Sequence, residues 1–369
     1  MNIEIGICIL FLILFLWKIL KQSFTISPAL VSIIFRVSLV TIYFYTGFHK
    51  LNTDFFNPCT SCVNKYNELF ISNFTGKKIL LSENVSTFFQ YATIFLEMVL
   101  PFGLFWRQTR AVTAILLLSF HIYLGYTLFA DFEALIVFMM AGCTLDFEKK
   151  QPNPKLFLGL KIYVLIAMCA IFVKPFLYKL FKGDIILVNF TYGNIFNIGV
   201  ILFLIFYFRN NKMAQTQLPK KLLIYPIILF LLISCWALKA YFGFGNSANL
   251  TMFSNLMTES NRNNHFLIDT KKTKMTDWEE DSVLILKLHD TLKSYKLENF
   301  KLPITEFHYQ SKLFSKHFPE VKLNATVVYK NDTIKILDLK NSKYAETRWW
   351  YKYINFRKIQ PEGPNECLW

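Results

Sequence analysis

The chain has 369 residues, of which 54% are hydrophobic and 39 are phenylalanine. Only 18% of its residues are charged, whereas soluble domains carry about a quarter. Long runs without Lys, Arg, Asp or Glu exclude an ordinary soluble protein and indicate a polytopic membrane protein.

The net charge of +15 does not indicate a nucleic-acid-binding protein. There is no basic module interleaved with aromatic residues, and much of the positive charge lies in short loops between apolar segments. The positive-inside bias of membrane proteins accounts for that part of the charge.

Apolar segments predict about eight membrane spans. They run over residues 4–20, 28–48, 86–106, 111–130, 132–147, 156–180, 190–208 and 221–243. The fifth is short, so it could be re-entrant. We interpret the first as an anchored span and not as a cleaved signal peptide, because Glu4 precedes it and no Ala-x-Ala-like site follows it.

The loops between the spans predict an orientation. Lys and Arg residues follow the first, third, fifth and seventh spans, whereas the intervening loops are less basic or contain acidic residues. The basic loops are therefore expected in the cytoplasm, which places both termini on the extracytoplasmic side.

From about residue 245 charges become frequent and apolar runs shrink to strand length, which predicts strands. These are 282–288, 301–310, 324–330 and 332–339, with a hairpin turn at Asn331-Asp332. The aromatic and basic segment 348–356 is either the last strand or a segment at the membrane interface. The expected fold is an all-α polytopic membrane bundle of about eight spans (1–246) with a small extracytoplasmic β-rich domain (247–369).

The chain has seven cysteines, and Cys59 and Cys62 form a CxxC motif in a predicted loop. A zinc site normally needs two further ligands, and there is no second pair, so we expect no metal site. A local disulfide forms if this loop faces an oxidising compartment.

Four ionisable residues interrupt or end apolar spans: Arg36, Lys50, Glu97 and His121. Ionisable groups inside a membrane are costly, so each is a functional candidate. Structural roles are the alternatives. Arg36 and Glu97 could form a buried ion pair, Lys50 could extend to the interface, and His121 could be a core histidine bonded to a backbone carbonyl.

The functional alternative rests on the properties of a buried amine. Desolvation disfavours the ammonium form and lowers the pKa of lysine, which makes a neutral amine available as a base. A histidine across a cavity can bond an oxygen of a ring substrate. A lipidic quinol would reach such a pair from within the bilayer.

Several motifs resemble the vitamin K-dependent gamma-carboxylase family, whose membrane core is the HTTM domain. The stretch "YFYTGFHKLNTDFF" around Lys50 is similar to the family's second-span motif, and "LLLSFHIYLGYTLF" around His121 is similar to a later span. "EMVLPFGLFWRQTRAV" fits the family pattern between them. The segment "MFSNLMTESNRNNH" resembles a signature of the bacterial members.

The resemblance implies that Lys50 is the base toward reduced vitamin K or menaquinol, and that His121 binds the quinol. Oxygen then converts the deprotonated quinol to an epoxide, a glutamate γ-proton is removed, and the carbanion captures carbon dioxide. Residues expected near the cofactor are His49, Glu97, Asn255, Glu259, Arg262 and His265. The last four would cap the mouth of the cavity, although Glu259 and Arg262 could also form an i,i+3 pair at a helix end.

These observations predict a quinol-dependent oxygenase or epoxidase in the bilayer, with glutamyl carboxylation as a candidate second activity. The C-terminal region is much shorter than that of animal carboxylases, which puts a glutamate-containing protein substrate in doubt. The main alternative is a non-catalytic subunit or assembly factor, because "GFHKL" also resembles DoxX-like proteins. A transporter ranks last, because the halves of the chain are not similar to each other.

Overall fold

The protein is represented by a computed structural model that describes residues 28–127, 219–247, 249–259, 261–364 and 367, with isolated positions between 136 and 205. The chain forms two compact units, one of residues 1–41 and 100–231 and the other of residues 42–99 and 232–369. The expected domain boundary after residue 246 stays a prediction.

Three helical stretches among the described residues are long and apolar enough to cross a membrane: Ala29–Phe48, Glu83–Leu104 and Lys220–Phe242. They coincide with the second, third and eighth predicted spans. The fourth becomes α5 (Arg110–Thr127), whose apolar part is shorter. The other four predicted spans lie largely outside the described residues, so the count of eight, the orientation and the position of the termini stay predictions.

In the first unit, polar side chains of α2 (Pro28–Phe48) are fixed by one backbone carbonyl. Ser32 Oγ and Arg36 Nε donate to the carbonyl oxygen of Cys143 at 2.8 and 2.9 Å. The side chain of Arg36 is buried. A hydrogen bond from a buried guanidinium to a carbonyl oxygen reduces the cost of burying a charged residue in an apolar helix.

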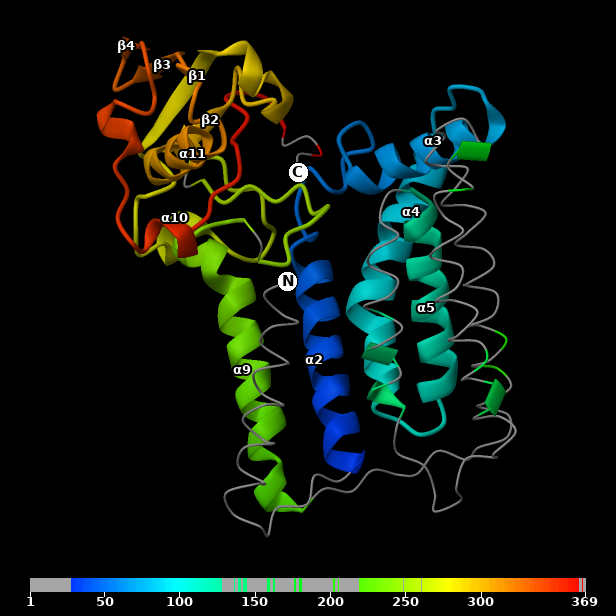
Figure 1. The fold of residues 1–369 in the computed structure, drawn as a ribbon. Coiled ribbons are helices and arrows are strands. Elements are labelled where there is room, and N and C mark those ends of the chain that lie inside the picture. Colours follow the sequence, from blue (N-terminus) through cyan, green and yellow to red (C-terminus); the bar gives the residue numbers. More distant parts are fainter. Residues whose placement is uncertain are drawn as a thin grey trace. The chain divides into compact units, whose positions relative to one another are not determined.

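The second unit contains helices from both ends of the chain (Figure 1). They are listed here in chain order: α3 (Cys62–Thr75), α4 (Glu83–Ile94), the π-helix η1 (Phe95–Val99), the end of α9 (Ile224–Leu238), the 3₁₀ helix η4 (Lys239–Phe242) and α10 (Thr270–Thr273). The third candidate span thus continues from α9 into η4, and the chain turns out of it at Gly243, whose φ is +80°.

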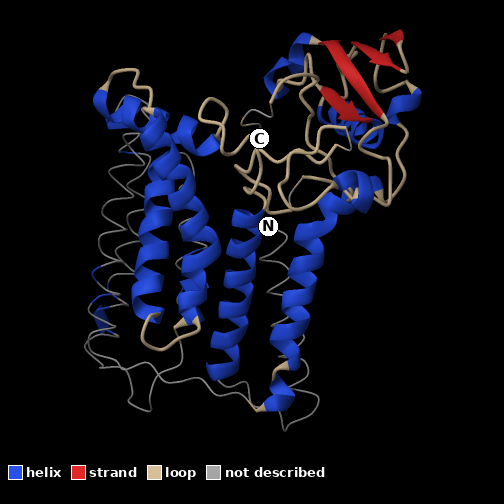
Figure 2. Ribbon diagram, turned by 180° about the vertical axis from the view of Figure 1, so that it is seen from behind, coloured by secondary structure: helices blue, strands red, loops and turns tan. Residues whose placement is uncertain are grey.

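The C-terminal part of this unit is a four-stranded antiparallel sheet in the order β2-β1-β3-β4 (Figure 2). Its elements are β1 (Ser282–Leu288), β2 (Lys301–Pro303), α11 (Ile304–His317), β3 (Ala325–Tyr329) and β4 (Asp332–Ile336). Alternate apolar side chains of β1 and β3 meet α11 in one hydrophobic core. The described part of the chain is therefore mostly helical, with a small sheet near its C-terminal end.

The prediction of a strand over residues 301–310 was wrong after its third residue, because α11 begins at Ile304. Phe307, Ser311 and Phe314 are buried at spacings of four and three, which is the period of a helix. Lys316 and His317 lie in the last turn, where positive charge complements the helix dipole.

Two smaller predictions in this region were also wrong. The hairpin turn is Lys330-Asn331 and not Asn331-Asp332, because Tyr329 pairs with Asp332 and the two residues between them have positive φ. Segment 348–356 is not a strand, since it holds a short 3₁₀ helix, η7 (Tyr351–Tyr353).

A disulfide joins Cys62, the first residue of α3, to Cys367. Cys59 is free and exposed. The CxxC pair therefore does not form the local disulfide that we considered, and its two cysteines have different roles.

Candidate functional site

Lys50 is the second residue after α2 and forms an ion pair with Glu97. Its Nζ lies 2.6 Å from Glu97 Oε2 and also donates to the carbonyl oxygen of Thr46 at 3.2 Å. Only 2% of Lys50 is exposed. Glu97 thus pairs with Lys50 and not with Arg36, which corrects the first structural alternative, and Lys50 does not extend to the surface of the protein.

The local backbone explains why Glu97 reaches Lys50. Glu97 lies in the π-helix η1, four residues before Pro101. Pro101 has no N–H, so the carbonyl of Glu97 has no α-helical donor, and the helix changes its winding here. Single π turns of this kind are frequent at functional sites.

Gly47 lets α2 lie directly against this π turn. A Cβ atom at Gly47 would be 2.4 Å from Met98 Cγ and 3.1 Å from Glu97 Cβ. The absence of a side chain at this position therefore sets the separation of the two backbones, and with it the reach of Lys50.

A group of rings lies beside the ion pair. His49 is fully buried, and its Nδ1 lies 2.8 Å from Tyr241 Oη. Burial, with smaller contributions from His265 and Lys50, lowers the pKa of His49 to about 3. His49 is therefore neutral at physiological pH.

His265 closes the C-terminal end of α2. Its Nδ1 accepts the backbone N–H groups of Leu267 and Ile268 at 3.1 and 3.2 Å. Its Nε2 must then carry the proton, which it donates to the carbonyl oxygen of Phe48 at 3.1 Å. The hydrogen bonds thus fix a neutral tautomer. Burial also favours the neutral form, because it lowers the pKa of His265.

Asparagine side chains join the segment after α2 to the segment that contains His265. Asn52 donates to the carbonyl oxygens of His49 and Ser254 at 2.8 and 2.6 Å. Asn264 donates to the carbonyl oxygen of Asn255 at 2.9 Å and to Asn52 Oδ1 at 3.3 Å.

Asn255 extends the same connection toward α3. Its Oδ1 accepts the N–H of Cys62 and its Nδ2 donates to Thr60, each at 2.9 Å. Its φ is +54°, a left-handed conformation that asparagine tolerates better than most residues. Asn255 thus contacts backbone groups at the start of α3, and His265 contacts a backbone carbonyl at the end of α2.

Glu259 and Arg262 do not form the helix-end ion pair that we considered. They lie in a loop, where the N–H of Arg262 donates to the carbonyl oxygen of Glu259, and the Arg262 side chain donates to the carbonyls of Gln360 and Gly363. Glu259 is buried near Glu279 and interacts with it electrostatically.

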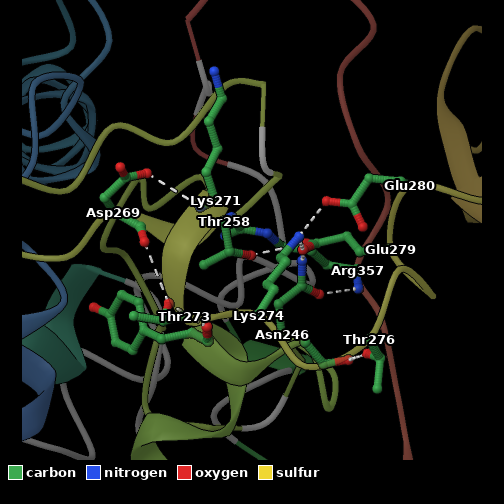
Figure 3. Close-up of polar contacts among 12 residues, drawn as sticks. Asn246, Thr258, Asp269, Lys271, Thr273, Lys274, Thr276, Glu279, Glu280 and Arg357 are labelled. Atoms are coloured by element: carbon green, nitrogen blue, oxygen red, sulfur yellow. Dashed lines mark hydrogen bonds and ion pairs between the residues drawn. The ribbon is translucent and has the colours of Figure 1, made fainter.

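Glu279 is the centre of a second polar cluster (Figure 3). It accepts hydrogen bonds from Asn246, from Thr258 Oγ1 at 2.8 Å and from Lys274 Nζ at 2.6 Å. Burial and the neighbouring Glu259 carboxylate raise its pKa to about 7, although Lys274 acts against this shift. This cluster was not found in the sequence analysis.

The predicted site residues are divided between the two units. Lys50, His49, Glu97 and His265 belong to the second unit, whereas His121 lies on α5 in the first. His121 is buried. Its pairing with Lys50 across a quinol stays a prediction.

Sequence reasoning missed Gly47 and Tyr241 as partners of the predicted residues. Gly47 precedes Lys50 by one helical turn, so a small residue at i−3 was a readable signal of close packing. Tyr241 lies far along the chain from His49, and nothing in the local pattern indicates their contact.

A comparison with protein families matches the HTTM domain to residues 16–131. The matched segment includes Lys50, Glu97 and His121. No curated protein and no solved structure matches the chain. The match covers about a third of the chain, and together with the three apolar helices it fits a membrane protein.

Proposed function

We propose that this chain is a membrane enzyme related to the vitamin K-dependent carboxylases, and that its Lys50–Glu97 pair takes a proton from a lipidic quinol. The observation that carries the proposal is the position of this buried pair inside the segment that matches the HTTM domain. A buried amine with a proton-accepting partner is the group that such chemistry needs.

The pair can exist in two protonation states. An ammonium–carboxylate pair is stabilised by its 2.6 Å contact, but burial disfavours both charges. Transfer of the proton from Lys50 to Glu97 gives a neutral amine and a carboxylic acid. Lys50 can then act as the base, while Glu97 holds the proton within hydrogen-bonding distance.

The residues around the pair would orient the amine for a phenolic substrate. The hydrogen bond from Lys50 Nζ to the carbonyl of Thr46 orients the amine. His49 adds no competing positive charge, because burial keeps it neutral. Reduced vitamin K or menaquinol, when bound, supplies the oxygen chemistry, with oxygen and carbon dioxide as co-substrates.

Further parts of the proposal rest on the family resemblance. His121 would bind the quinol from α5, and a glutamate side chain of a protein would be carboxylated. The expected activities are therefore quinol epoxidation and, in addition, glutamyl carboxylation.

The test is an epoxidation assay on the full chain in lipid nanodiscs, with reduced vitamin K or menaquinol and oxygen. Wild type would be compared with Lys50→Met, Glu97→Gln and the control Lys274→Met, which removes a lysine that is also buried in an ion pair. We expect epoxide from wild type and the control, little from Glu97→Gln and none from Lys50→Met.

A non-catalytic role, as in a DoxX-like subunit, is the competing function. It is favoured by the same ion pair, because a lysine with a buried partner can be purely structural. Absence of epoxide from wild type with every quinol tested, together with a folded protein, would support this second function and contradict the first.

A further inference from the structure

We propose that an exposed aromatic rim at the C-terminal end of the third candidate span binds the head-group layer of the lipid bilayer. The interfacial rim is defined here by exposed Phe244, Met275, Trp349 and Tyr353 and by the partly buried Trp278 and Trp350 that connect them. These residues belong to the second unit and hold the C-terminal part of the chain against the membrane surface.

The end of the span has the side chains of a membrane boundary. The candidate span ends at Phe242, and Trp236 and Lys239 lie in its last turns. Lys239 Nζ is 4.3 Å from the centre of the Trp236 ring. Trp and Lys both favour the interface, where one end of the side chain is apolar and the other is wet.

The loop that carries Met275 is bonded directly to this boundary. Thr273 Oγ1 donates to the carbonyl oxygen of Tyr241 at 2.8 Å. The N–H of Met275 donates to the carbonyl oxygen of Phe242 at 3.1 Å. Thr276 Oγ1 donates to Gly243 at 2.7 Å (Figure 3). Hydrogen bonds to three consecutive carbonyls therefore hold this loop against the end of the span.

Ring contacts extend the rim from the span to segment 348–356. Phe244 packs edge-on against Trp278, with centroids 6.0 Å apart, and Trp278 stacks on Trp350 at 5.0 Å. Trp349 and Tyr353 are in edge contact at 6.2 Å. In Figure 1, the red segment that contains η7 is drawn near α10 and the end of α9.

The rim exposes large apolar and aromatic side chains, whereas a surface that faces water is normally polar. Met275 is 72% exposed and Trp349 is 78% exposed. Lys352 Nζ lies 4.7 Å from the Tyr353 ring, and Arg348 is also exposed. Aromatic rings next to basic side chains match the interfacial layer, which has apolar chains below and phosphate groups above.

A bilayer is favoured over a protein partner because the rim is continuous with a membrane span. The end of α2 repeats the arrangement. The N–H of Phe266 donates to the carbonyl oxygen of Leu51 at 3.0 Å, and the side chains of Phe266 and Leu267 are exposed there. Two candidate spans thus end beside exposed apolar residues of the same C-terminal loops.

The test uses the fluorescence of Trp349 in the full chain reconstituted in phosphatidylcholine vesicles. The emission of wild type minus that of Trp349→Phe isolates this residue, and the conservative change keeps a ring at an exposed position. The tryptophan fluorescence is quenched with lipids that carry bromine on the acyl chain near the head group. The matched control is Leu337→Trp in the Trp349→Phe background, because Leu337 is 85% exposed and follows β4 of the sheet.

We expect the Trp349 signal to be blue-shifted and to lose intensity in brominated vesicles, while the signal at residue 337 stays unquenched and is lost to aqueous acrylamide. Equal behaviour of the two positions would overturn the proposal. A Trp349 signal protected from acrylamide but unaffected by brominated lipid would also overturn it, because a protein surface would then cover the rim.

Discussion

Lys50 Nζ and Glu97 Oε2 lie 2.6 Å apart, although the residues are separated by 47 positions in the chain. The contact joins the end of α2 to a π turn in the next candidate span, and the protein buries both side chains. A charge held in this way is stabilised mainly by its partner, because water cannot replace that partner. The stability of the pair should therefore depend on both residues together.

Removing one partner should destabilise the protein more than removing both. Lys50→Met and Glu97→Gln each leave one buried group without its counter-charge, which typically costs about 3–5 kcal/mol. The double variant should recover a large part of this loss. Thermal unfolding in nanodiscs over the four proteins of the double-mutant cycle measures the coupling. Strictly additive losses would show that the two residues do not stabilise each other.

Replacing Gly47 by alanine should be harmful, although alanine is the better helix former. Its Cβ would be 2.4 Å from Met98 Cγ, and overpacking of this kind costs about 1–3 kcal/mol. A second change, Met98→Ala, should restore part of the thermal stability. Gly159→Ala is the control, because a Cβ there meets nothing within 4 Å. Equal effects at the two glycines would argue against close packing at Gly47.

The disulfide predicts a specific pattern of thiol reactivity. Without reductant, a maleimide should label exposed Cys59 but neither Cys62 nor Cys367, and peptide mapping should recover Cys62 linked to Cys367. Cys62→Ser should lower the thermal midpoint, because cross-links of this kind contribute about 2–4 kcal/mol. Cys59→Ser is the control and should leave it unchanged. A recovered Cys59–Cys62 peptide would contradict the pairing.

Glu279 should make stability depend on pH in the acid range. Its pKa is about 7 in the folded protein against 4.5 as the reference value, so the folded state holds the proton more tightly. The free energy of unfolding should then fall as the pH rises from about 4.5 to about 7, by at most about 3 kcal/mol. Above that range this contribution is lost.

Thermal midpoints of wild type and Glu279→Gln across this pH range test the assignment. The glutamine variant cannot titrate, so its midpoint should change less with pH. Glu259 and Lys274 are present in both proteins, which separates their effects from that of Glu279. Parallel curves would show that another group causes the dependence.

The sequence predicted much of the sheet because its signals are local. Alternating β-branched residues defined β1 and β3 closely. The segment that begins at Ile304 was misread as a strand because it contains Ile304, Thr305, Phe307 and Tyr309, residue types that are common in strands. The helical period becomes visible only when Phe307, Ser311 and Phe314 are considered together, and burial against the sheet then selects the helix.

The candidate site was predicted in part, for a similar reason. Lys50 and Glu97 could each be found as ionisable residues in apolar segments, but their pairing depends on a tertiary contact. Burial alone cannot distinguish Arg36 from Lys50 as the partner of Glu97. The position of Gly47 beside the π turn decides this choice, and π winding has no strong sequence signal apart from Pro101.

The bond between Cys62 and Cys367 also has a consequence for the order of events during biosynthesis. The two cysteines are 305 positions apart, so the ribosome must make the whole intervening chain before Cys62 can meet its partner. Until then Cys62 is available to Cys59, its neighbour in the CxxC motif. The native bond can therefore form only after synthesis has reached residue 367, and only if Cys62 is not bonded to Cys59 at that time.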